Sequence, residues 1–492
     1  MRIPTLLITL LFPLTAIAKL PDIILMMSDD QGWEETGYNG HPHVKTPVLD
    51  EMAANGLNFD RFYAYPTCSP TRASFLTGRD PNRMGVFSPG WSIRQEEITI
   101  AHLLAEAGYH CAHIGKWHVG AVKEESPVNP GAMGFHEWLS HDNFFEMDPP
   151  LSRNGGPPEI IKGESSEVLI AEAIEVIARA RAADKPAFLV IWFGSPHEPY
   201  SGLPEDLALY DHIPAKYNRT VRLTCNDTGR QVSRPLGEVL RERYAEITAM
   251  DRAIGTLRDH LAETGTRDNT LLFFCGDNGT SGESALGGPH RAVKGSIYEG
   301  GTLVPGIIEW PARIPRPVTS HVRATTSDLL PTIAAITGQP LPDRPLDGID
   351  LTPVFDGTLT VRPTPIGCWV MNRSHLRGKE LEPYIDPELQ QGTTPLVKLM
   401  RGQFTRDFNN VHHPGITEQD YRGQQSFIVG DHKLVVRTRD EGEGIELFHL
   451  KDDPAETTNL ADEKPELVEE LRAGMREWQE SVLNSLMGND YR

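Results

Sequence analysis

The stretch DIILMMSDD, residues 22–30, contains an unbroken apolar run that ends in a serine and two aspartates. A short run without polar alternation is typical of a strand that is buried on both faces, as in the middle of a parallel sheet. Parallel sheets of this kind bind ligands beyond the carboxyl ends of their strands. The stretch therefore predicts a central parallel strand, with Asp29 and Asp30 at the edge of the sheet where a site would form.

Three more stretches have the same form, an apolar run followed by polar residues: GYHCAHIGKWH (108–118), PAFLVIWFGSPH (186–197) and TLLFFCGDNG (270–279). Helical patterns lie between these runs, at residues 46–56, 98–107, 167–181 and 237–261. Strands that alternate with helices predict an α/β fold, in which helices sandwich a large, mostly parallel sheet.

The composition changes near residue 353, where proline and glycine become more frequent. QSFIVGDHKLVVRTRD and GIELFHLKDD predict two antiparallel strands around a Gly-Asp turn, and residues 465–483 predict a closing helix. We therefore expect a large α/β domain over residues 19–355 and a smaller C-terminal α+β subdomain over residues 356–492.

The first eighteen residues have the pattern of a secretory signal peptide. Arg2 is followed by an apolar segment and by Ala16-Ile17-Ala18, an A-x-A cleavage site. No later segment is long and apolar enough to span a membrane. We expect an exported protein, periplasmic or secreted.

The net charge and the number of cysteines argue against two classes of protein, nucleic-acid binders and disulfide-built folds. The chain of 492 residues carries 47 basic and 68 acidic side chains, a net charge of −21, which argues against a nucleic-acid binder. An anionic substrate remains compatible with this charge if a few cations gather in a cleft. The five cysteines are too sparse for a disulfide-built core, and their odd number leaves at least one thiol unpaired.

Two pairs of oxygen-bearing side chains follow predicted strands: Asp29 with Asp30, and Asp277 with Asn278. Carboxylate and amide oxygens suit Ca²⁺ or Mg²⁺. The alternative for each pair is ordinary turn chemistry, since Asp and Asn also favour turns. Two pairs in one α/β chain favour a metal site.

Basic side chains occupy the same kind of position. Lys116 and His118 are two residues apart, so on one strand they would share a face. His197 follows an apolar run, and Lys294 lies in the glycine-rich stretch VKGSIYEGG. Taken singly, each of these lysines could be an ordinary solvated side chain, and each histidine could be an ordinary packed one, without a role in a site. Their shared placement after strands is the informative feature.

The stretch CSPTRASFLTGR, residues 68–79, places Cys68 just before a predicted helix, with Arg72 in its opening turn. A helix N-terminus favours negative charge at this point. Taken alone, Cys68 could be a small buried apolar residue or a thiolate nucleophile.

The stretch C-S-P-T-R, followed by A-S-F-L-T-G-R, resembles the signature of the type I sulfatases, members of the alkaline-phosphatase-like superfamily. The blocks SDDQGWEETGYNG, GKWH, SPHEPY, GDNG and KGSIYEGGTLVP follow in that family's order, and ELFHLKDDPAETTNLA resembles its C-terminal part. Together these blocks span residues 20–462. The resemblance implies the α/β fold predicted above and hydrolysis of sulfate esters.

The resemblance also implies the chemistry of the site. It implies that Cys68 is oxidised to Cα-formylglycine and hydrated to a gem-diol, which requires a formylglycine-generating enzyme or an equivalent maturase as a partner. It implies a divalent cation, Ca²⁺ ahead of Mg²⁺, whose ligands here would be Asp29, Asp30, Asp277 and Asn278.

Five further residues receive roles from the resemblance. Arg72 would stabilise the gem-diol, and His118 would bond its second hydroxyl. Lys116, Lys294 and His197 would clamp the sulfate and assist the leaving oxygen. A metal and two lysines would stabilise the charge that spreads over the sulfate oxygens during transfer.

The substrate is the least determined feature of the sequence. Export favours a sulfated carbohydrate, a polysaccharide or its oligosaccharides. Candidate substrate-binding residues in the long polar loops are His290, Arg291, Arg401, Arg406, His412 and His413. Two other functions remain open: a phosphate or phosphonate ester hydrolase of the same superfamily, and a sugar-binding protein without turnover.

Overall fold

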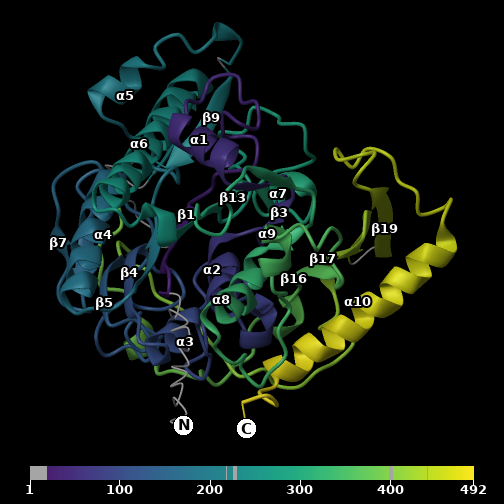
Figure 1. Ribbon diagram of the computed structural model, residues 1–492. Coiled ribbons are helices and arrows are strands. Elements are labelled where there is room, and N and C mark those ends of the chain that lie inside the picture. Colours follow the sequence, from purple (N-terminus) through teal and green to yellow (C-terminus); the bar gives the residue numbers. More distant parts are fainter. Residues whose placement is uncertain (1–18, 218, 225–229, 398–402, 440–441, 492) are drawn as a thin grey trace, which may run out of the picture.

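The computed structural model describes residues 19–217, 219–224, 230–397, 403–439 and 442–491. The predicted signal peptide (1–18) and Arg401 lie outside these ranges. The described part contains a large sheet covered by helices and a smaller sheet with one long helix (Figure 1). This confirms the predicted α/β fold with a separate antiparallel sheet near the C-terminus.

The large sheet has ten strands, and its centre is parallel. β11, β1, β8, β4 and β5 run parallel to one another, β14 runs parallel to β2, and the remaining neighbours are antiparallel. The order across the sheet is β14 (Val318–Ser320), β2 (Leu57–Phe59), β13 (Gly306–Glu309), β11 (Thr270–Gly276), β1 (Asp22–Ser28), β8 (Ala187–Trp192), β4 (His110–Lys116), β5 (Glu137–His141), β6 (Pro150–Arg153) and β7 (Glu159–Ile160).

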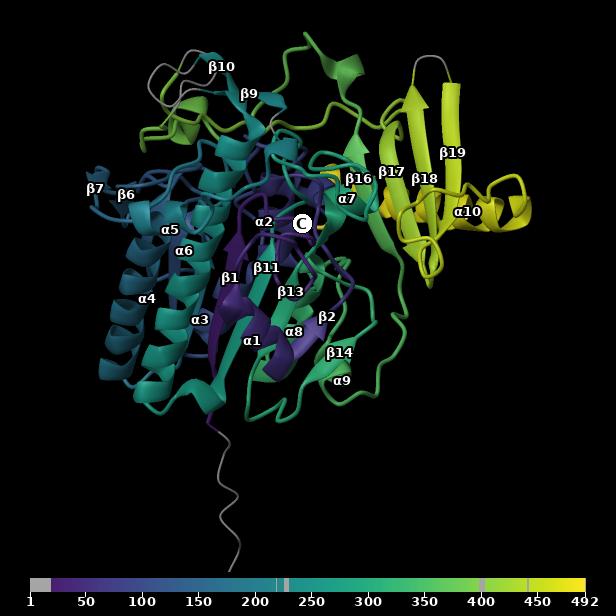
Figure 2. The ribbon, with the colours of Figure 1, turned by 90° about the horizontal axis from the view of Figure 1, so that it is seen from above.

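The apolar run of β1 is buried on both faces of this sheet. Ile23 and Leu25 pack in the cluster that contains residues of α2 (Cys68–Thr77), α3 (Ile100–Glu106) and α8 (Leu329–Thr337). Ile24 and Met26 pack in the cluster that contains residues of α1 (Pro47–Asn55), α4 (Ser165–Ala182) and α6 (Leu236–Glu263). Figure 2 shows α4 and α6 side by side next to β1. Two buried faces explain why this strand has no polar alternation.

Two local details differ from the sequence predictions. α2 begins at Cys68 itself, so the cysteine is the first residue of the helix rather than the residue before it. β4 ends at Lys116, so Lys116 and His118 do not share the face of one strand. His118 lies beyond the strand with φ of 57°, a left-handed conformation that turns the chain.

The smaller sheet has four antiparallel strands in the order β16 (Ile366–Met371), β17 (Gly423–Val429), β18 (His432–Arg439) and β19 (Gly442–His449). The predicted turn at Gly430-Asp431 joins β17 to β18, both of which lie largely in QSFIVGDHKLVVRTRD. GIELFHLKDD contains most of β19, which pairs with β18 as a third strand, so the two predicted strands are three. β16 was not predicted and pairs with β17 across a long loop. α10 (Pro465–Leu486) packs on this sheet, where Leu471 contributes to the same apolar cluster as Leu434.

The described chain also contains shorter elements: β3 (Phe62–Tyr63), β12 (Leu303–Val304) and β15 (Ala324–Thr325) in one sheet, β9 (Thr220–Thr224) and β10 (Gln231–Pro235) in another, the helices α5 (Pro204–Ala208), α7 (Glu299–Thr302) and α9 (Thr352–Phe355), and several short 3-10 helices. Within the described ranges, no helix has both the length and the apolar character needed to cross a membrane. The four cysteines in these ranges, Cys68, Cys111, Cys275 and Cys368, are buried free thiols.

Candidate active site

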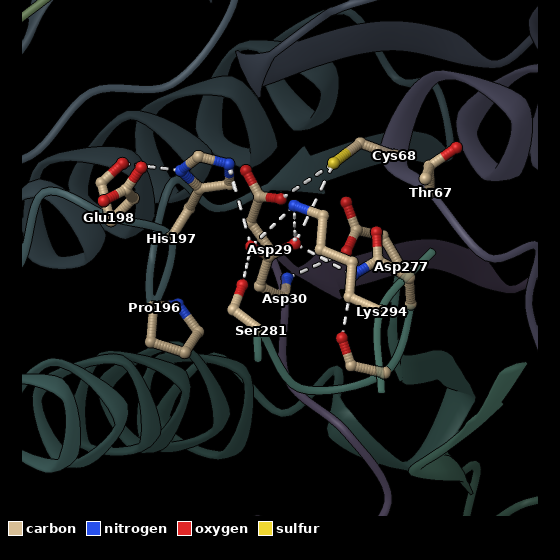
Figure 3. Close-up of polar contacts among 12 residues, drawn as sticks. Asp29, Asp30, Thr67, Cys68, Pro196, His197, Glu198, Asp277, Ser281 and Lys294 are labelled. Carbon is tan, nitrogen blue, oxygen red and sulfur yellow. Dashed lines mark hydrogen bonds and ion pairs between the residues drawn. The ribbon is translucent and has the colours of Figure 1, made fainter. Parts of the chain in front are cut away.

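The carboxyl ends of β1 and β11 bring the predicted metal ligands together. β1 lies between β11 and β8, with Ser28 beside Gly276. Beyond the strands, the backbone amide of Asp29 donates to Ser195 O (3.0 Å), and that of Asp277 donates to Ser28 O (3.1 Å). Figure 3 shows the resulting cluster of side chains at this edge of the sheet.

Cys68 faces this cluster from the start of α2. Its Sγ lies 3.5 Å from Asp29 Oδ1 and 3.9 Å from Asp30 Oδ1 (Figure 3). Burial and the negative charge of Asp277 raise the pKa of the Cys68 thiol well above its usual value. This shift favours the neutral thiol and gives no support to the thiolate alternative.

The spacing from Cys68 to Arg72 is one turn of α2, so both side chains lie on one face of the helix. The Arg72 guanidinium is fully buried, and its Nη2 donates to Asp277 Oδ2 at 2.9 Å. Its Nη1 donates to the backbone oxygen of Lys116 at 3.1 Å. Arg72 therefore joins α2 to the ends of β11 and β4.

Two lysines neutralise the aspartates that follow β1. Lys116 Nζ is hydrogen-bonded to Asp29 Oδ2, and both side chains are fully buried. Lys294 Nζ donates to Asp30 Oδ2 at 2.7 Å and is the more exposed of the two lysines. Burial opposes ionisation of both carboxyl groups, but the nearby cations hold the pKa of Asp29 and of Asp30 well below the usual range.

Asp277 has the opposite electrostatic balance. Burial, together with repulsion from Asp29 and Asp30, raises the pKa of Asp277 to about 7, although Arg72 and Lys116 partly offset this. Three carboxyl groups thus share one buried region, and repulsion among them limits how fully they ionise together.

The donor set of this region fits a hard divalent cation. Asn278 Nδ2 donates to Asp30 Oδ1 at 2.8 Å, while its buried Oδ1 has no hydrogen-bond partner in the described chain. Ligand-type atoms of Asp29, Asp30, Cys68 and His197 all lie within 4.8 Å of one another. Clustered carboxylate oxygens with a free amide oxygen suit Ca²⁺ or Mg²⁺.

Two histidines border the cluster. His197 donates from Nδ1 to the backbone oxygen of Glu198 (2.6 Å), which leaves Nε2 facing Asp30 Oδ2 at 3.7 Å. Its ring stacks on Phe144 at 4.7 Å, and burial lowers the pKa of His197 to about 4. His118 is buried, neither of its ring nitrogens has a hydrogen-bond partner in the described chain, and burial beside Lys116 lowers its pKa.

Three hydroxyl groups support these residues and were not predicted. Ser281 Oγ donates to Asp30 Oδ2 at 2.6 Å, and Ser69 Oγ donates to His118 O at 2.6 Å. Thr71 Oγ1 donates to the backbone oxygen of Asp277 at 2.6 Å. Ser69 and Thr71 lie inside the quoted stretch around Cys68, so their position was a signal that could have identified them.

The substrate-binding candidates divide into two groups, and the first lies near the site. Lys116 and Arg406 both contribute positive charge that lowers the pKa of His118. His290 packs edge-on against Trp33 at 4.9 Å, and its buried Nδ1 has no hydrogen-bond partner in the described chain. Arg406 thus lies near His118, whereas His290 lies against the loop that follows Asp30.

The second group is held by other parts of the fold. Arg291 forms an ion pair with Glu446 of β19 at 3.1 Å and stacks on Tyr298 at 3.9 Å. Two neighbouring histidines are likewise engaged: the His412 ring packs on Tyr384 (4.0 Å), and His413 Nε2 bonds Asp420 Oδ1 (3.0 Å). These contacts secure the C-terminal sheet and loops.

Comparisons with known proteins show which family and fold this chain resembles. A family model described as Sulfatase matches residues 21–339. Arylsulfatase A from Homo sapiens is 34% identical over 380 residues, which cover 70% of this chain and 69% of that protein. N-acetylgalactosamine-6-sulfatase from Canis lupus familiaris is 32% identical over 385 residues, covering 70% and 67%. The crystal structure of Ps i-CgsB in complex with k-i-k-neocarrahexaose has the same fold, with a TM-score of 0.73 at 22% identity over 94% of this chain and 93% of that one.

Proposed function

The chain belongs to the sulfatase family and is a sulfuric ester hydrolase, and from this premise we propose that it removes sulfate from a sulfated carbohydrate through a modified Cys68. The similarity to an N-acetylgalactosamine-6-sulfatase supports a sugar sulfate as the substrate. The signal-peptide pattern of residues 1–18 supports an exported enzyme that acts on polysaccharides or oligosaccharides outside the cytoplasm.

One observation carries the proposed mechanism: the Cys68 thiol is buried against carboxylates that two lysines and an arginine pair with, and this burial raises its pKa. A neutral thiol is a poor nucleophile, yet the groups around it are those needed to hold an anion and a metal. Oxidation of Cys68 to formylglycine by a maturase resolves this mismatch. The hydrated aldehyde would supply one hydroxyl to attack sulfur and a second hydroxyl to expel sulfate afterwards.

We assign a divalent cation, Ca²⁺ ahead of Mg²⁺, to four oxygen-bearing residues: Asp29, Asp30, Asp277 and Asn278. When bound, the cation would supply positive charge beside the sulfate oxygens. Arg72 would remain on Asp277, where it holds the carboxylate in place and adds a buried positive charge close to Cys68.

The remaining roles belong to side chains that can reach a substrate. Lys116 and Lys294, now paired with Asp29 and Asp30, would bind sulfate oxygens. His197 keeps its Nδ1 proton on Glu198 O, so Nε2 of the neutral ring carries no proton and would first have to take one up in order to protonate the leaving oxygen. His118, uncharged and with both nitrogens unpaired in the described chain, can accept a proton from a hydroxyl group at position 68.

Phosphate and phosphonate esters are the competing substrate class, because a metal and two lysines would also stabilise phosphoryl transfer. The sulfatase relatives favour sulfate. Purified enzyme should therefore hydrolyse an aryl sulfate faster than the matching aryl phosphate. Dominant phosphatase turnover would contradict the proposal.

The modification is tested separately by mass spectrometry of the tryptic peptide that contains Cys68, from protein made in its native host. We expect a mass in which an aldehyde replaces the thiol. An unmodified thiol, in a host that modifies other sulfatases, would contradict the formylglycine mechanism and favour sugar binding without turnover.

A further inference from the structure

Three of the loops that form the candidate active site follow neighbouring strands: residues 29–35 after β1, residues 194–200 after β8 and residues 277–281 after β11. The strand pairing that joins these segments ends at Ser28 beside Gly276 and at Met27 beside Trp192. Beyond these points, other contacts must fix how the loops sit against one another.

A buried ion pair beneath the site makes such contacts. Arg243 of α6 is fully buried and pairs with Glu35, which is 3% exposed at its side chain. Arg243 Nε donates to Glu35 Oε1 at 2.7 Å, and Nη2 donates to Glu35 Oε2 at 2.6 Å. This two-bond geometry is the strong form of an arginine–carboxylate pair.

The remaining donors of Arg243 reach two of the three loops. Nη2 also donates to the backbone oxygen of Asp30 at 2.6 Å, and Nη1 donates to the backbone oxygen of Pro196 at 2.5 Å. Nη1 further approaches the Tyr200 hydroxyl at 3.4 Å. The five N–H groups of the guanidinium thus face five acceptors, a number that lysine, with three donors, cannot match.

Glu35 extends the network to the third loop. Thr280 Oγ1 donates to Glu35 Oε2 at 2.9 Å. The next residue, Ser281, donates its hydroxyl to Asp30 Oδ2 at 2.6 Å. Arg243 and Glu35 therefore connect the loop of Asp30, the loop of His197 and the loop that follows Asn278.

We propose that Arg243 and Glu35 are positioning residues for the divalent-cation site, an inference that rests on the cation assigned in the proposed function. They do not touch the cation; they act by holding the Asp30 and Thr280 segments at the separation that the ligands require. Removal of a residue that supports metal ligands without touching the metal typically reduces metal affinity by roughly 10–100-fold. A buried ion pair is weak evidence for stability alone, so cation affinity is the property to measure.

The same helix offers a matched control. Arg258 of α6 is also buried, with 5% of its side chain exposed. Its Nε donates to Glu309 at 2.8 Å, and its Nη2 bonds Glu51 at 3.2 Å, so it joins α6 to β13 and α1. Loss of this arginine tests the general effect of breaking a buried ion pair on α6.

The experiment is calorimetric titration of Ca²⁺ into the chelator-treated full chain, for the parent, Arg243→Met and Arg258→Met. We expect Arg243→Met to weaken Ca²⁺ binding by roughly 10–100-fold and Arg258→Met to change it by less than about twofold. Saturating Ca²⁺ should restore part of the aryl sulfatase rate of Arg243→Met. Equal Ca²⁺ affinity in parent and Arg243→Met, or equal losses in both variants, would overturn the inference.

A milder variant keeps the test decisive if Arg243→Met does not fold. Thr280→Val removes the hydroxyl that lies 2.9 Å from both Glu34 Oε1 and Glu35 Oε2, and it leaves the ion pair in place. We expect it to weaken Ca²⁺ binding by at least about threefold, with unchanged affinity counting against the inference. A parent chain that hydrolyses aryl sulfate but binds neither Ca²⁺ nor Mg²⁺ would overturn the cation site itself, and with it this inference.

Discussion

Asn278 donates its side-chain amide to Asp30 Oδ1 at 2.8 Å, and its own Oδ1 is buried without a hydrogen-bond partner in the described chain. Nδ2 also donates to Gly279 O at 3.0 Å, so both amide hydrogens are occupied and the orientation of the amide group is set. A buried acceptor without a donor costs free energy, about 1–3 kcal/mol, unless another group satisfies it. A divalent cation beside Asp30 would do so.

Replacement of this amide should weaken the proposed cation site. Asn278→Ala removes one oxygen ligand and the hydrogen bond that orients Asp30, so we expect Ca²⁺ affinity to fall by at least about tenfold in calorimetric titration. Asn269→Ala, at the opposite end of β11, is the control because its amide donates to the backbone oxygens of Lys19 and Leu20, away from the site. Parent-like affinity in Asn278→Ala would exclude Asn278 as a ligand.

Cys68→Ala should abolish sulfate ester hydrolysis and leave the fold and Ca²⁺ binding largely intact. The substitution removes the thiol that oxidation would replace with the aldehyde oxygen on Cβ of residue 68, whereas the oxygen ligands around it remain. Turnover is measured with an aryl sulfate, and folding by the thermal unfolding midpoint. Substantial residual activity in this variant would show that Cys68 does not carry the nucleophile.

Lys294→Met should reduce kcat by roughly 10²–10³-fold, because it removes a charge that can stabilise the sulfate oxygens in a partly buried site. The variant also frees Asp30 from its ion pair, so Ca²⁺ affinity should not fall. Lys162→Met is the control, since Lys162 forms an exposed ion pair with Asp148. A Lys294→Met enzyme with unchanged kcat and a raised KM would assign Lys294 to substrate binding alone.

The buried carboxyl group of Asp251 should make the free energy of unfolding depend on pH, independently of catalysis. It lies in α6 and accepts hydrogen bonds from the backbone amides of Val48 (3.0 Å) and Leu49 (2.8 Å) at the start of α1. Burial raises the pKa of Asp251 to about 7, above its usual 3.8. Between these values the folded chain holds more protons than the unfolded chain, so this group lowers the free energy of unfolding as pH rises.

Asp251→Asn cannot ionise and should lack that contribution. The free energy of unfolding of the variant, minus that of the parent, should therefore increase as the pH rises from about 5 to about 8. Urea unfolding at each pH measures both values. At the lower pH it should be the less stable protein, because the amide cannot accept both backbone hydrogen bonds as the carboxyl group does. A stability difference that does not change with pH would show that Asp251 titrates normally.

Several features of the site were predictable because they depend on local sequence and on one geometric rule. Apolar runs buried on both faces identify the central strands, and the carboxyl ends of neighbouring parallel strands meet at one edge of a sheet. Asp29 and Asp277 were predicted to meet there, and the structure places both around Cys68. The one-turn spacing of Cys68 and Arg72 was likewise readable, because residues four apart share a helix face.

Other features depended on contacts between distant segments. The backbone turns at His118 with a positive φ, so its ring lies off the β4 strand that was expected to carry it. Arg291 was a substrate candidate, but β19 places Glu446 beside it. A guanidinium pairs with whichever carboxylate the packing brings near, and the spacing of residues along the chain does not specify that partner.

The sequence by itself determined the strand-and-helix order, the position of the aspartates at the carboxyl edge of the sheet and the placement of Cys68 and Arg72 on one helix. Those properties follow from the periodicity and chemistry of contiguous residues. Only the tertiary structure decided which side chains hold the site in shape. Arg243 and Glu35 are 208 residues apart, and the pair exists because α6 packs against the sheet beneath the loop that follows β1.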